Sequence, residues 1–433
     1  MTLLTEAPVA PSPVLTRLPV VIIGAGPVGL AAAAHLLERG IEPLVLEQGE
    51  RVGAAIRQWG HTRLFSSWKH VTDAASVRLL TADGWKPQHP EAMPTGDDLV
   101  KYYLEPLAAT PALRDRIRFG VRVDAVSRLG MDRTRTTGRA EAPFVVRLGT
   151  GDELQARAVI DASGTFGMPN PVIASGFRPR QESAVADHLT HGLPDVLGRD
   201  RARFAGKHTV VVGAGHSAAN TLLALDRLAE REPGTTVAWL IRSATPARVY
   251  GADADELAGR ASLGAAVHDL VRSGRVELLD STLVQDVEAA PGDRVTLVAT
   301  RAGEPVRIDA DTVVVATGFR PDLDMLREIR VGLDEVVEAP VRLAPLIDPN
   351  LHSCGTVPPH GVDELSHPEP GFWLAGMKSY GRAPTFLLLT GYEQVRSIAD
   401  ELAGNRDAAR RIELVLPETG VCSTDLAAGS CCS

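Results

Sequence analysis

Short apolar runs alternate with helical patterns near the start of the chain, and this order predicts an α/β fold. Four apolar residues at 20–23 predict a strand that is buried on both faces. The alanine- and leucine-rich residues 30–37 predict a helix that ends at Gly40. A further apolar run at 43–46 predicts the next strand. Strand, turn, helix and strand in this order form the start of a βαβ unit.

The same order returns in the second half of the chain. A β-rich run at 209–212 precedes an alanine-rich helical pattern at 217–229, and another apolar run follows at 236–241. An apolar strand that ends in Ala-Ser-Gly or Ala-Thr-Gly occurs at 158–164 and again at 312–318. We expect each copy to be the strand that completes one dinucleotide-binding domain. The sequence therefore predicts an α/β protein with two Rossmann-like domains, the second inserted into the first.

Weaker patterns predict the remaining elements. Strands are expected at 121–126, 144–148, 156–160 and 372–376, and helices at 98–107 and from about 384 onward. The polar and basic residues 131–139 are expected to form a solvated hairpin tip.

Residues 24–29 read G-x-G-x-x-G between the first strand and its helix, which is the pattern of a dinucleotide site. Gly24 allows the tight turn, Gly26 lets the backbone approach a pyrophosphate, and Gly29 lets helix and strand pack closely. The start of the helix offers unpaired N–H groups to that anion. The second strand ends at Glu47, where an acidic side chain is expected to bind a ribose. The neighbours expected at this site are Ala25, Pro27 and Gln48. The alternative is a glycine turn in an unrelated α/β sheet.

Residues 213–218 repeat the pattern as G-x-G-x-x-A, with Gly213, Gly215 and Ala218 at its fixed positions. The strand that follows ends at Arg242 and not at an acid. An acid there would bind a ribose 2′-hydroxyl, whereas Arg242 can pair with a 2′-phosphate, which favours NADP over NAD. The alternative is that Arg242 is a solvated strand-end residue. The neighbours expected at this site are His216, Ser217 and Ser243.

Two nucleotide-binding folds in one chain imply hydride transfer between two cofactors, and FAD with NADPH is the usual pair. The expected division is an FAD domain at 18–200 and 326–415, an NADPH domain at 201–325 and a cysteine-containing tail at 416–433. Further cofactor contacts are expected from the glycines that follow the strands, Gly164, Gly318 and Gly376. The aromatic and cationic mixture at 51–70 can also line a cofactor, or form an irregular, partly buried crossover.

Composition narrows the class of protein. The chain has 433 residues, 44% of them hydrophobic and 23% charged, which is typical of a globular protein with a large core. Its net charge of −9, with both signs interspersed, argues against nucleic acid as the main partner. Apolar runs are too short to span a membrane, and the first nineteen residues lack a hydrophobic signal core, so we expect a cytoplasmic protein.

The chain resembles the flavoproteins with two dinucleotide-binding domains. The resemblance rests on residues 24–29, 161–164, 213–218 and 316–318, and it spans about 18 to 400. Within that group the chain looks most like the flavin-containing monooxygenases and their N-hydroxylating or Baeyer–Villiger relatives. The stretch 376–386 and the cysteine-bearing C-terminus are similar to NADPH-dependent flavin monooxygenases associated with arsenic resistance.

The resemblance implies how the chain would work. FAD would lie across the first domain, with Arg57 and Trp59 near the flavin and the backbone near Val123 at the adenine. NADPH would reduce the flavin, which would then add dioxygen as a peroxyflavin and oxygenate a small substrate through a nitrogen, sulfur or trivalent arsenic atom. Such a reaction requires no catalytic residue of the protein, and the sequence contains no recognisable catalytic triad.

The cysteines bear on the arsenical substrate. None of the four occurs before residue 354, and three crowd the last twelve residues. Trivalent arsenic is thiophilic, so we expect the candidate substrate ligands to be Cys354, Cys422, Cys431 and Cys432. The alternative is that the tail is disordered and its cysteines are incidental. A zinc site built from His352, Cys354, His360 and His367 has irregular spacing, and no metal is expected.

Two other classes of function remain open. A flavin disulfide or metal-ion reductase requires a redox dithiol beside the flavin, and the missing N-terminal cysteines argue against it. A metalloid sensor would bind its ligand through the thiol tail and use the flavin only as a structural group.

Overall fold

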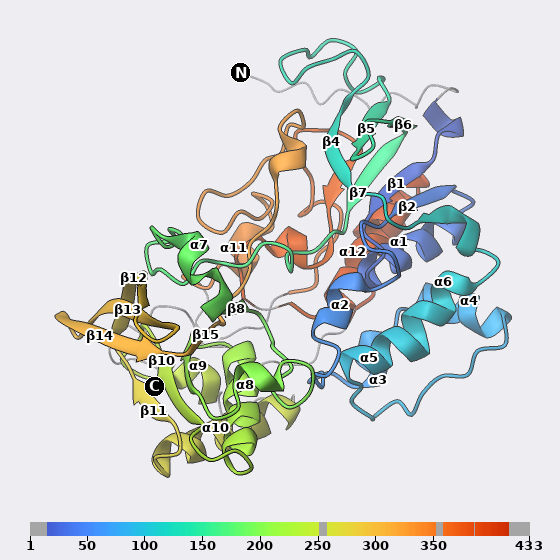
Figure 1. The fold of residues 1–433 in the computed structure, drawn as a ribbon. Coiled ribbons are helices and arrows are strands. Elements are labelled where there is room, and N and C mark those ends of the chain that lie inside the picture. The colour runs from blue at the N-terminus through green and yellow to red at the C-terminus, as the bar shows by residue number, and fades with distance from the viewer. Residues whose placement is uncertain (1–14, 251–257, 352–357, 385, 415–433) are drawn as a thin grey trace, which may run out of the picture.

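A computed structural model describes residues 15–250, 258–351, 358–384 and 386–414. Figure 1 shows two lobes, each built on a parallel sheet. The chain passes from the first lobe to the second and then returns to the first. The first lobe contains both ends of the described chain, and the second is formed by a single continuous insertion. The predicted α/β class and the nested order of the domains are therefore confirmed.

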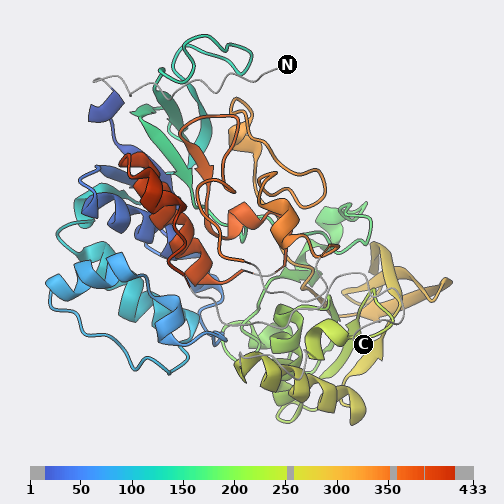
Figure 2. The same cartoon turned by 180° about the vertical axis from the view of Figure 1, so that it is seen from behind.

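The first sheet has five parallel strands in the order β16-β7-β1-β2-β3. Its strands are β1 (Val20–Ile23), β2 (Pro43–Leu46), β3 (Ile117–Arg118), β7 (Ala158–Asp161) and β16 (Phe372–Leu374). Helices α1 (Pro27–Glu38) and α12 (Leu388–Leu402) lie side by side against one face, as Figure 2 shows. The other face packs on a small antiparallel sheet formed by β4 (Val123–Arg128), β5 (Phe144–Leu148) and β6 (Glu153–Ala156).

Strand β1 is buried on both faces, as its four apolar residues predict. Val20 and Ile22 belong to the core under α1, whereas Val21 and Ile23 belong to the core under the antiparallel sheet. Such alternation follows from the two-residue period of side chains along a strand.

The second sheet has the order β11-β10-β9-β15-β8 and is also parallel. Its strands are β8 (Leu189–His191), β9 (His208–Val212), β10 (Thr236–Leu240), β11 (Glu277–Leu279) and β15 (Thr312–Val315). Helices α8 (His216–Ala229), α9 (Ala247–Tyr250) and α10 (Ala258–Arg272) pack together on one face. The other face packs on β12 (Thr282–Ala290), β13 (Arg294–Arg301) and β14 (Glu304–Ala310).

A helical segment extends from the first lobe between β2 and β3. It contains α2 (Ala54–Gln58), α3 (Trp68–Val71), α4 (Ala74–Ala82), α5 (Gly96–Leu99) and α6 (Glu105–Ala109). A π-helical turn at Val100–Leu104 joins α5 to α6, so the predicted helix at 98–107 is confirmed within one continuous helical run. The side chains of Thr95 and Asp98 form a capping box at its start. The other short helices are α7 (Glu182–Val185), α11 (Ala344–Ile347) and α13 (Arg406–Arg410).

The loop after β4 is exposed at 132–138, as predicted for a solvated tip, but the prediction is wrong at its last residue, Arg139. Arg139 was expected in a solvated hairpin tip, but its side chain is 4% exposed and forms an ion pair of 2.8 Å with Glu369. Arg128 pairs with the same carboxylate at 2.8 Å. Burial raises the pKa of Glu369, the Arg139 and Arg128 hydrogen bonds lower it, and the net shift is downward. Two buried cations therefore share one buried anion. Their ion pairs fix this loop against the segment that precedes β16.

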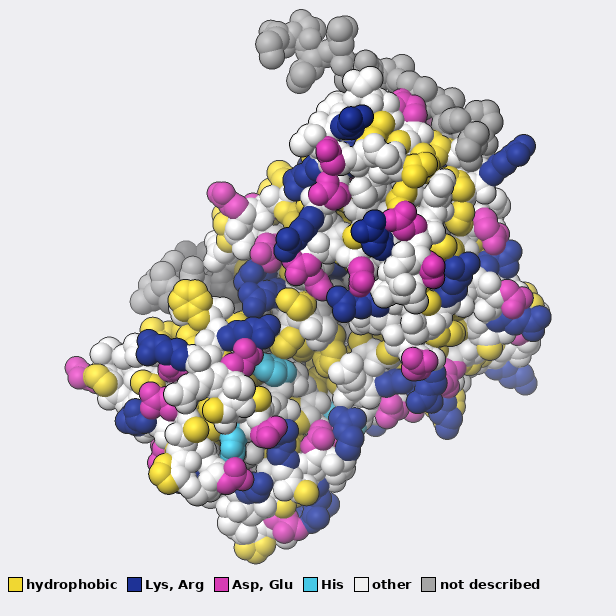
Figure 3. Space-filling model, turned by 45° about the horizontal axis from the view of Figure 1, so that its top comes forward, with side chains coloured by type: hydrophobic (Ala, Val, Ile, Leu, Met, Phe, Trp, Pro, Cys, Tyr) yellow, Lys and Arg dark blue, Asp and Glu magenta, His cyan; other side chains and the backbone are white. Residues whose placement is uncertain are grey.

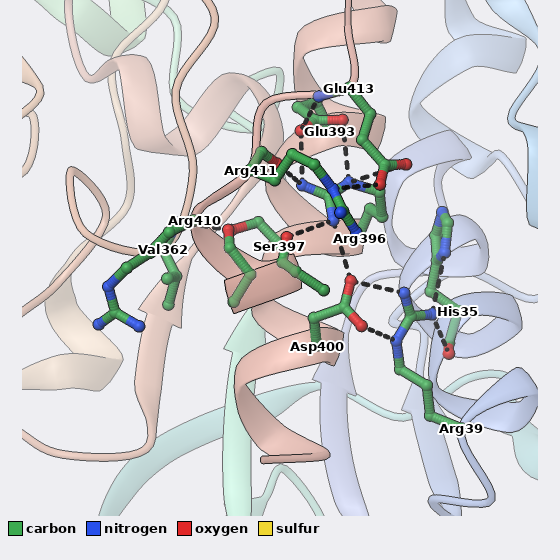
Figure 4. Close-up of polar contacts among 12 residues, drawn as sticks. His35, Arg39, Val362, Glu393, Arg396, Ser397, Asp400, Arg410, Arg411 and Glu413 are labelled. Atoms are coloured by element: carbon green, nitrogen blue, oxygen red, sulfur yellow. Dashed lines mark hydrogen bonds and ion pairs between the residues drawn. The ribbon is translucent and has the colours of Figure 1, made fainter. Parts of the chain in front are cut away.

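A second polar network fastens the end of the described chain (Figure 4). Arg396 of α12 bonds to the carboxylates of Glu393 and Asp400 and donates to the carbonyl of Ala408 at 3.0 Å. Asp400 in turn accepts from Arg39 at the end of α1, at 2.7 Å. Helices α1, α12 and α13 are thereby joined.

Candidate functional site

The first glycine turn lies between β1 and α1 in an open conformation. Gly24 has φ +101°, and a Cβ there would lie 2.9 Å from the carbonyl oxygen of Ala162. A Cβ at Gly29 would lie 2.0 Å from the oxygen of Gly24, whereas a Cβ at Gly26 would meet nothing within 4 Å. Helix α1 starts at Pro27 with no side-chain cap. Space and free N–H groups therefore coincide where a pyrophosphate would bind.

Glu47 lies next to this turn, as predicted for the residue after β2. It is 7% exposed, and its two oxygens accept hydrogen bonds from the backbone of Ala25 at 2.7 Å and of Gly49 at 2.8 Å. A carboxylate offers about four lone-pair sites, so acceptor capacity remains for a ribose hydroxyl. Gln48 is exposed beside it. The carboxylate thus supports the turn, and its role as a ribose ligand stays a prediction.

Arg57, Trp59 and Val123 are held by protein contacts. Arg57 donates to Glu105 at 2.6 Å and to the carbonyl of Val52 at 3.1 Å. Trp59 packs against Gly96, where a Cβ would lie 2.9 Å from its ring. Val123 is buried at the start of β4. Their roles at a flavin or an adenine stay predictions.

The second glycine turn repeats this geometry between β9 and α8. Gly213 has φ +131°, and a Cβ there would lie 2.2 Å from the oxygen of Ala316. A Cβ at Gly215 would meet nothing within 4 Å, and α8 starts at the next residue with no side-chain cap. Ala218 is fully buried where the pattern requires a small residue. Trp239 supports the turn, since its indole donates to the oxygen of Gly213 at 2.7 Å.

His216 and Ser217 form the first turn of α8. The ring of His216 lies 5.1 Å from that of Phe65, which belongs to the first lobe. Residues from the two lobes therefore meet at the second glycine turn. Figure 3 shows a hollow between the lobes with hydrophobic side chains on its floor.

Arg242 and Ser243 follow β10, as predicted. Arg242 is exposed, so its guanidinium is accessible to a 2′-phosphate. The hydroxyl of Ser243 donates to the carbonyl of Thr245 at 2.7 Å, and its carbonyl accepts from Ser281 at 3.0 Å. These bonds fix the turn that presents Arg242.

The glycines after the strands all have left-handed backbones. Gly164, Gly318 and Gly376 have φ of +71°, +86° and +68°. Gly376 lies against the side chain of Val28 in the first turn of α1, where its Cβ would be 3.2 Å away. Gly318 instead pairs with the segment that leads from β7 to β8, since its carbonyl accepts from the backbone of Asn170 at 2.9 Å.

Sequence reasoning missed a buried charged cluster beside the first turn. Lys378 and Asp161 are both 0% exposed and pair at 2.6 Å, and Lys378 also donates to the hydroxyl of Ser163 at 3.0 Å. The available signal was a lysine inside the otherwise apolar or small stretch Gly376–Tyr380.

All four cysteines and His352 lie outside the described residues, so the proposed thiol ligands have no structural account. Of the remaining candidate zinc ligands, His360 bonds to Gln394 at 2.9 Å and burial lowers its pKa. His367 accepts from the backbone of Gly332 at 3.3 Å. Within the described ranges, no three His, Cys, Asp or Glu side chains gather closely enough to hold a metal ion. Nor does this part of the chain contain a helix suited to crossing a bilayer.

Comparisons with known proteins agree with this geometry. The ferredoxin–NADP reductase of Ignicoccus hospitalis is 27% identical over 317 residues, which are 72% of this chain and 81% of that protein. The indole-3-pyruvate monooxygenase YUCCA1 of rice is 30% identical over 212 residues, 48% of this chain and 45% of that protein. Among solved structures, bacillithiol disulfide reductase from Bacillus cereus has a TM-score of 0.65 at 22% identity, covering 90% of this chain and 99% of that one. DfoA, the cadaverine monooxygenase of Erwinia amylovora, also has a TM-score of 0.65, at 14% identity, covering 94% and 99%.

The family model for pyridine nucleotide-disulphide oxidoreductases matches residues 21–341, which include both glycine turns. FAD and NADP(H) are the cofactors of this group, and the open turns at Gly26 and Gly215 fit a pyrophosphate each. The chain therefore belongs to the pyridine nucleotide-disulphide oxidoreductase family and is an FAD- and NADP(H)-dependent oxidoreductase.

Proposed function

We propose that this protein is an NADPH-dependent flavoprotein monooxygenase of a small molecule. The observation that carries the proposal is the combination of two open nucleotide turns with a chain that has no cysteine before residue 354. A disulfide reductase of this family needs a thiol pair beside the flavin, and residues 1–353 supply none. The similarity to a plant monooxygenase across 48% of the chain supports the same conclusion.

The residues of the chain bind and orient the two cofactors. The turn around Gly26 and the carboxylate of Glu47 would hold FAD, and the turn around Gly215 with Arg242 would hold NADPH. Bound FAD supplies the redox chemistry, since it accepts a hydride and reacts with dioxygen. The hydrophobic floor between the lobes would keep water from the reacting centre (Figure 3).

The proposed substrate carries a soft, electron-rich atom, and a trivalent arsenical is our first choice. The four cysteines at 354, 422, 431 and 432 are thiol ligands suited to trivalent arsenic. Oxygenation would convert it to the pentavalent form. Small organic amines and sulfides are the alternative substrates. A metalloid sensor without turnover is the alternative of another class.

A second function is favoured by one specific observation. Ferredoxin–NADP reductases are 25–28% identical to this chain over 71–78% of its length in several organisms. They support a reductase that passes electrons from NADPH to a separate carrier protein, which also needs no internal dithiol.

Oxygen labelling separates these functions. The flavin-loaded protein is mixed with NADPH and ¹⁸O₂ in the presence of methylarsenite, arsenite, an alkylamine or a sulfide. The proposal predicts substrate-stimulated NADPH oxidation, little hydrogen peroxide and one ¹⁸O atom in the product. Fast reduction of an added ferredoxin, with no labelled product from any substrate, would establish the reductase instead.

Truncation tests the proposed role of the tail, residues 416–433, in binding the arsenical. A chain that ends after Pro417 lacks Cys422, Cys431 and Cys432 but retains both glycine turns. We expect unchanged FAD content and slower arsenical turnover, with amine or sulfide turnover as the control. Equal arsenical kinetics in both proteins would remove the tail from the mechanism.

A further inference from the structure

A lysine is buried at the edge of the first nucleotide site. Lys378 lies in the turn after β16 and is 0% exposed, as is Asp161, the last residue of β7. Their charged atoms are 2.6 Å apart. Ser163 is exposed and completes the cluster: its hydroxyl donates to Asp161 at 2.7 Å and accepts from Lys378 at 3.0 Å.

The cluster adjoins the first glycine turn. A Cβ at Gly24 would lie 3.0 Å from the Cα of Ser163, so the two turns are in contact. The backbone of Ala375 donates to the carbonyl of Asp161 at 2.9 Å, which brings the turn after β16 to the same edge. Ligands of open α/β sheets bind at this carboxyl edge of the strands.

The order of the strands indicates which half of FAD would lie over the cluster. Glu47, the predicted ribose ligand, follows β2, and the predicted pyrophosphate turn follows β1. Strands β7 and β16 lie on the opposite side of β1 from β2. A dinucleotide with its ribose over β2 and its pyrophosphate over β1 therefore extends its flavin half over β7 and β16, where Asp161 and Lys378 lie.

Stability alone does not account for this ion pair. Removing two charges from water costs free energy, and well-packed hydrophobic residues often serve a fold as well as a buried pair or better. The strands are already joined here by backbone hydrogen bonds. Charges in a low-dielectric interior act strongly on a nearby redox group, because water does not screen them.

We propose that Lys378 and Asp161 are positioning residues that set the reduction potential of the flavin through their opposite charges. Reduction adds negative charge to a flavin, so a nearby cation favours the reduced form and a nearby anion disfavours it. Ser163 is the exposed member of the cluster, so its hydroxyl is the group through which the buried pair would reach the cofactor. Its single proton is donated to Asp161, so it faces the cofactor as an acceptor. The inference rests on FAD binding alone and not on the oxygenation reaction.

The test measures the midpoint potential of the bound flavin by anaerobic titration against a reference dye. The variants are Lys378→Met, Asp161→Asn and the double variant, with Lys86→Met as the control because Lys86 is exposed and lies outside the candidate cofactor sites. Lys378→Met should lower the equilibrium constant for flavin reduction at least tenfold, about 30 mV for a two-electron couple. Asp161→Asn should shift the potential in the opposite direction. The double variant should shift the potential less than either single variant, and Lys86→Met should not shift it.

Opposite signs are the decisive result, because a general loosening of the site would move both single variants the same way. Shifts of the same sign, or no shift, would overturn the proposal. Each single substitution leaves a buried charge without its partner, so Ser163→Ala provides a second measurement on a variant that keeps both charges. It should weaken FAD binding about fivefold, the effect of one hydrogen bond. Unchanged FAD affinity in Ser163→Ala would show that the cluster does not face the cofactor.

Discussion

Alanine substitutions at Gly26 and Gly29 test the FAD site, because these two glycines of the first turn have different surroundings. A Cβ at Gly26 would meet nothing within 4 Å, and its backbone, with φ −81° and ψ −177°, suits alanine. A Cβ at Gly29 would lie 2.0 Å from the oxygen of Gly24. Gly26→Ala should therefore affect the cofactor, whereas Gly29→Ala should affect the fold as well.

The expected magnitudes follow from these distances. At Gly29 the added carbon must separate from the oxygen by about 1 Å or more, and such overpacking costs about 1–3 kcal/mol of unfolding free energy. At Gly26 the cofactor-free protein should change by less than about 0.5 kcal/mol. The methyl group would instead displace the pyrophosphate. Loss of one hydrogen bond to a charged group costs about 1.5–3 kcal/mol, or roughly 10- to 150-fold in FAD affinity.

The assay combines urea unfolding of the cofactor-free protein with FAD titration followed by flavin fluorescence. Gly215→Ala is the matched control, because its Cβ would also meet nothing within 4 Å but lies in the second turn. It should weaken NADPH binding and leave FAD affinity unchanged. Wild-type FAD affinity in Gly26→Ala would refute the assignment of the first turn, and equal destabilisation by Gly26→Ala and Gly29→Ala would refute the steric argument.

Three further predictions concern other parts of the molecule. Arg242→Ala should weaken NADPH binding roughly tenfold or more and NADH binding little, as measured by flavin reduction rates against coenzyme concentration; equal losses would show that Arg242 contacts no 2′-phosphate. Glu369→Gln leaves the buried cations of Arg128 and Arg139 without their carboxylate, so the free energy of unfolding should fall by about 3–5 kcal/mol. Urea unfolding measures this change, and a decrease of less than about 1 kcal/mol would contradict the prediction. Burial lowers the pKa of His367 to about 4, while an unfolded histidine titrates near 6.5. The unfolded chain therefore binds an extra proton between these values, and this side chain should cost roughly 3 kcal/mol of stability as the pH falls from 6.5 to 4. The difference in pH dependence between the wild type and His367→Asn measures this contribution, and identical curves would contradict it.

The sequence predicted those parts of the fold that depend on local pattern. The apolar runs and glycines within residues 20–40 predict a strand, a turn and a helix, and the structure places each as expected. The same holds for the second turn, where the pattern also requires the buried Ala218. Local patterns suffice here because each element is decided by its own neighbours.

Long-range pairings could not be predicted in this way. Arg139 belongs to a polar, basic stretch, and only its distant partner Glu369 makes burial possible. Lys378 is likewise buried because Asp161, more than 200 residues earlier, ends the neighbouring strand. A single sequence carries no signal for which charges meet across a fold, so the buried clusters emerged only from the structure.

Anaerobic mixing of the flavin-loaded protein with NADPH tests the central claim most directly. If the two turns bind FAD and NADPH, NADPH should reduce the bound flavin and bleach its absorbance at least as fast as the enzyme turns over. The same assignment predicts that Gly26→Ala loses the flavin while Gly215→Ala keeps the flavin but slows the bleaching. A purified protein that takes up no FAD, or whose bound flavin stays oxidised in excess NADPH, would contradict the account.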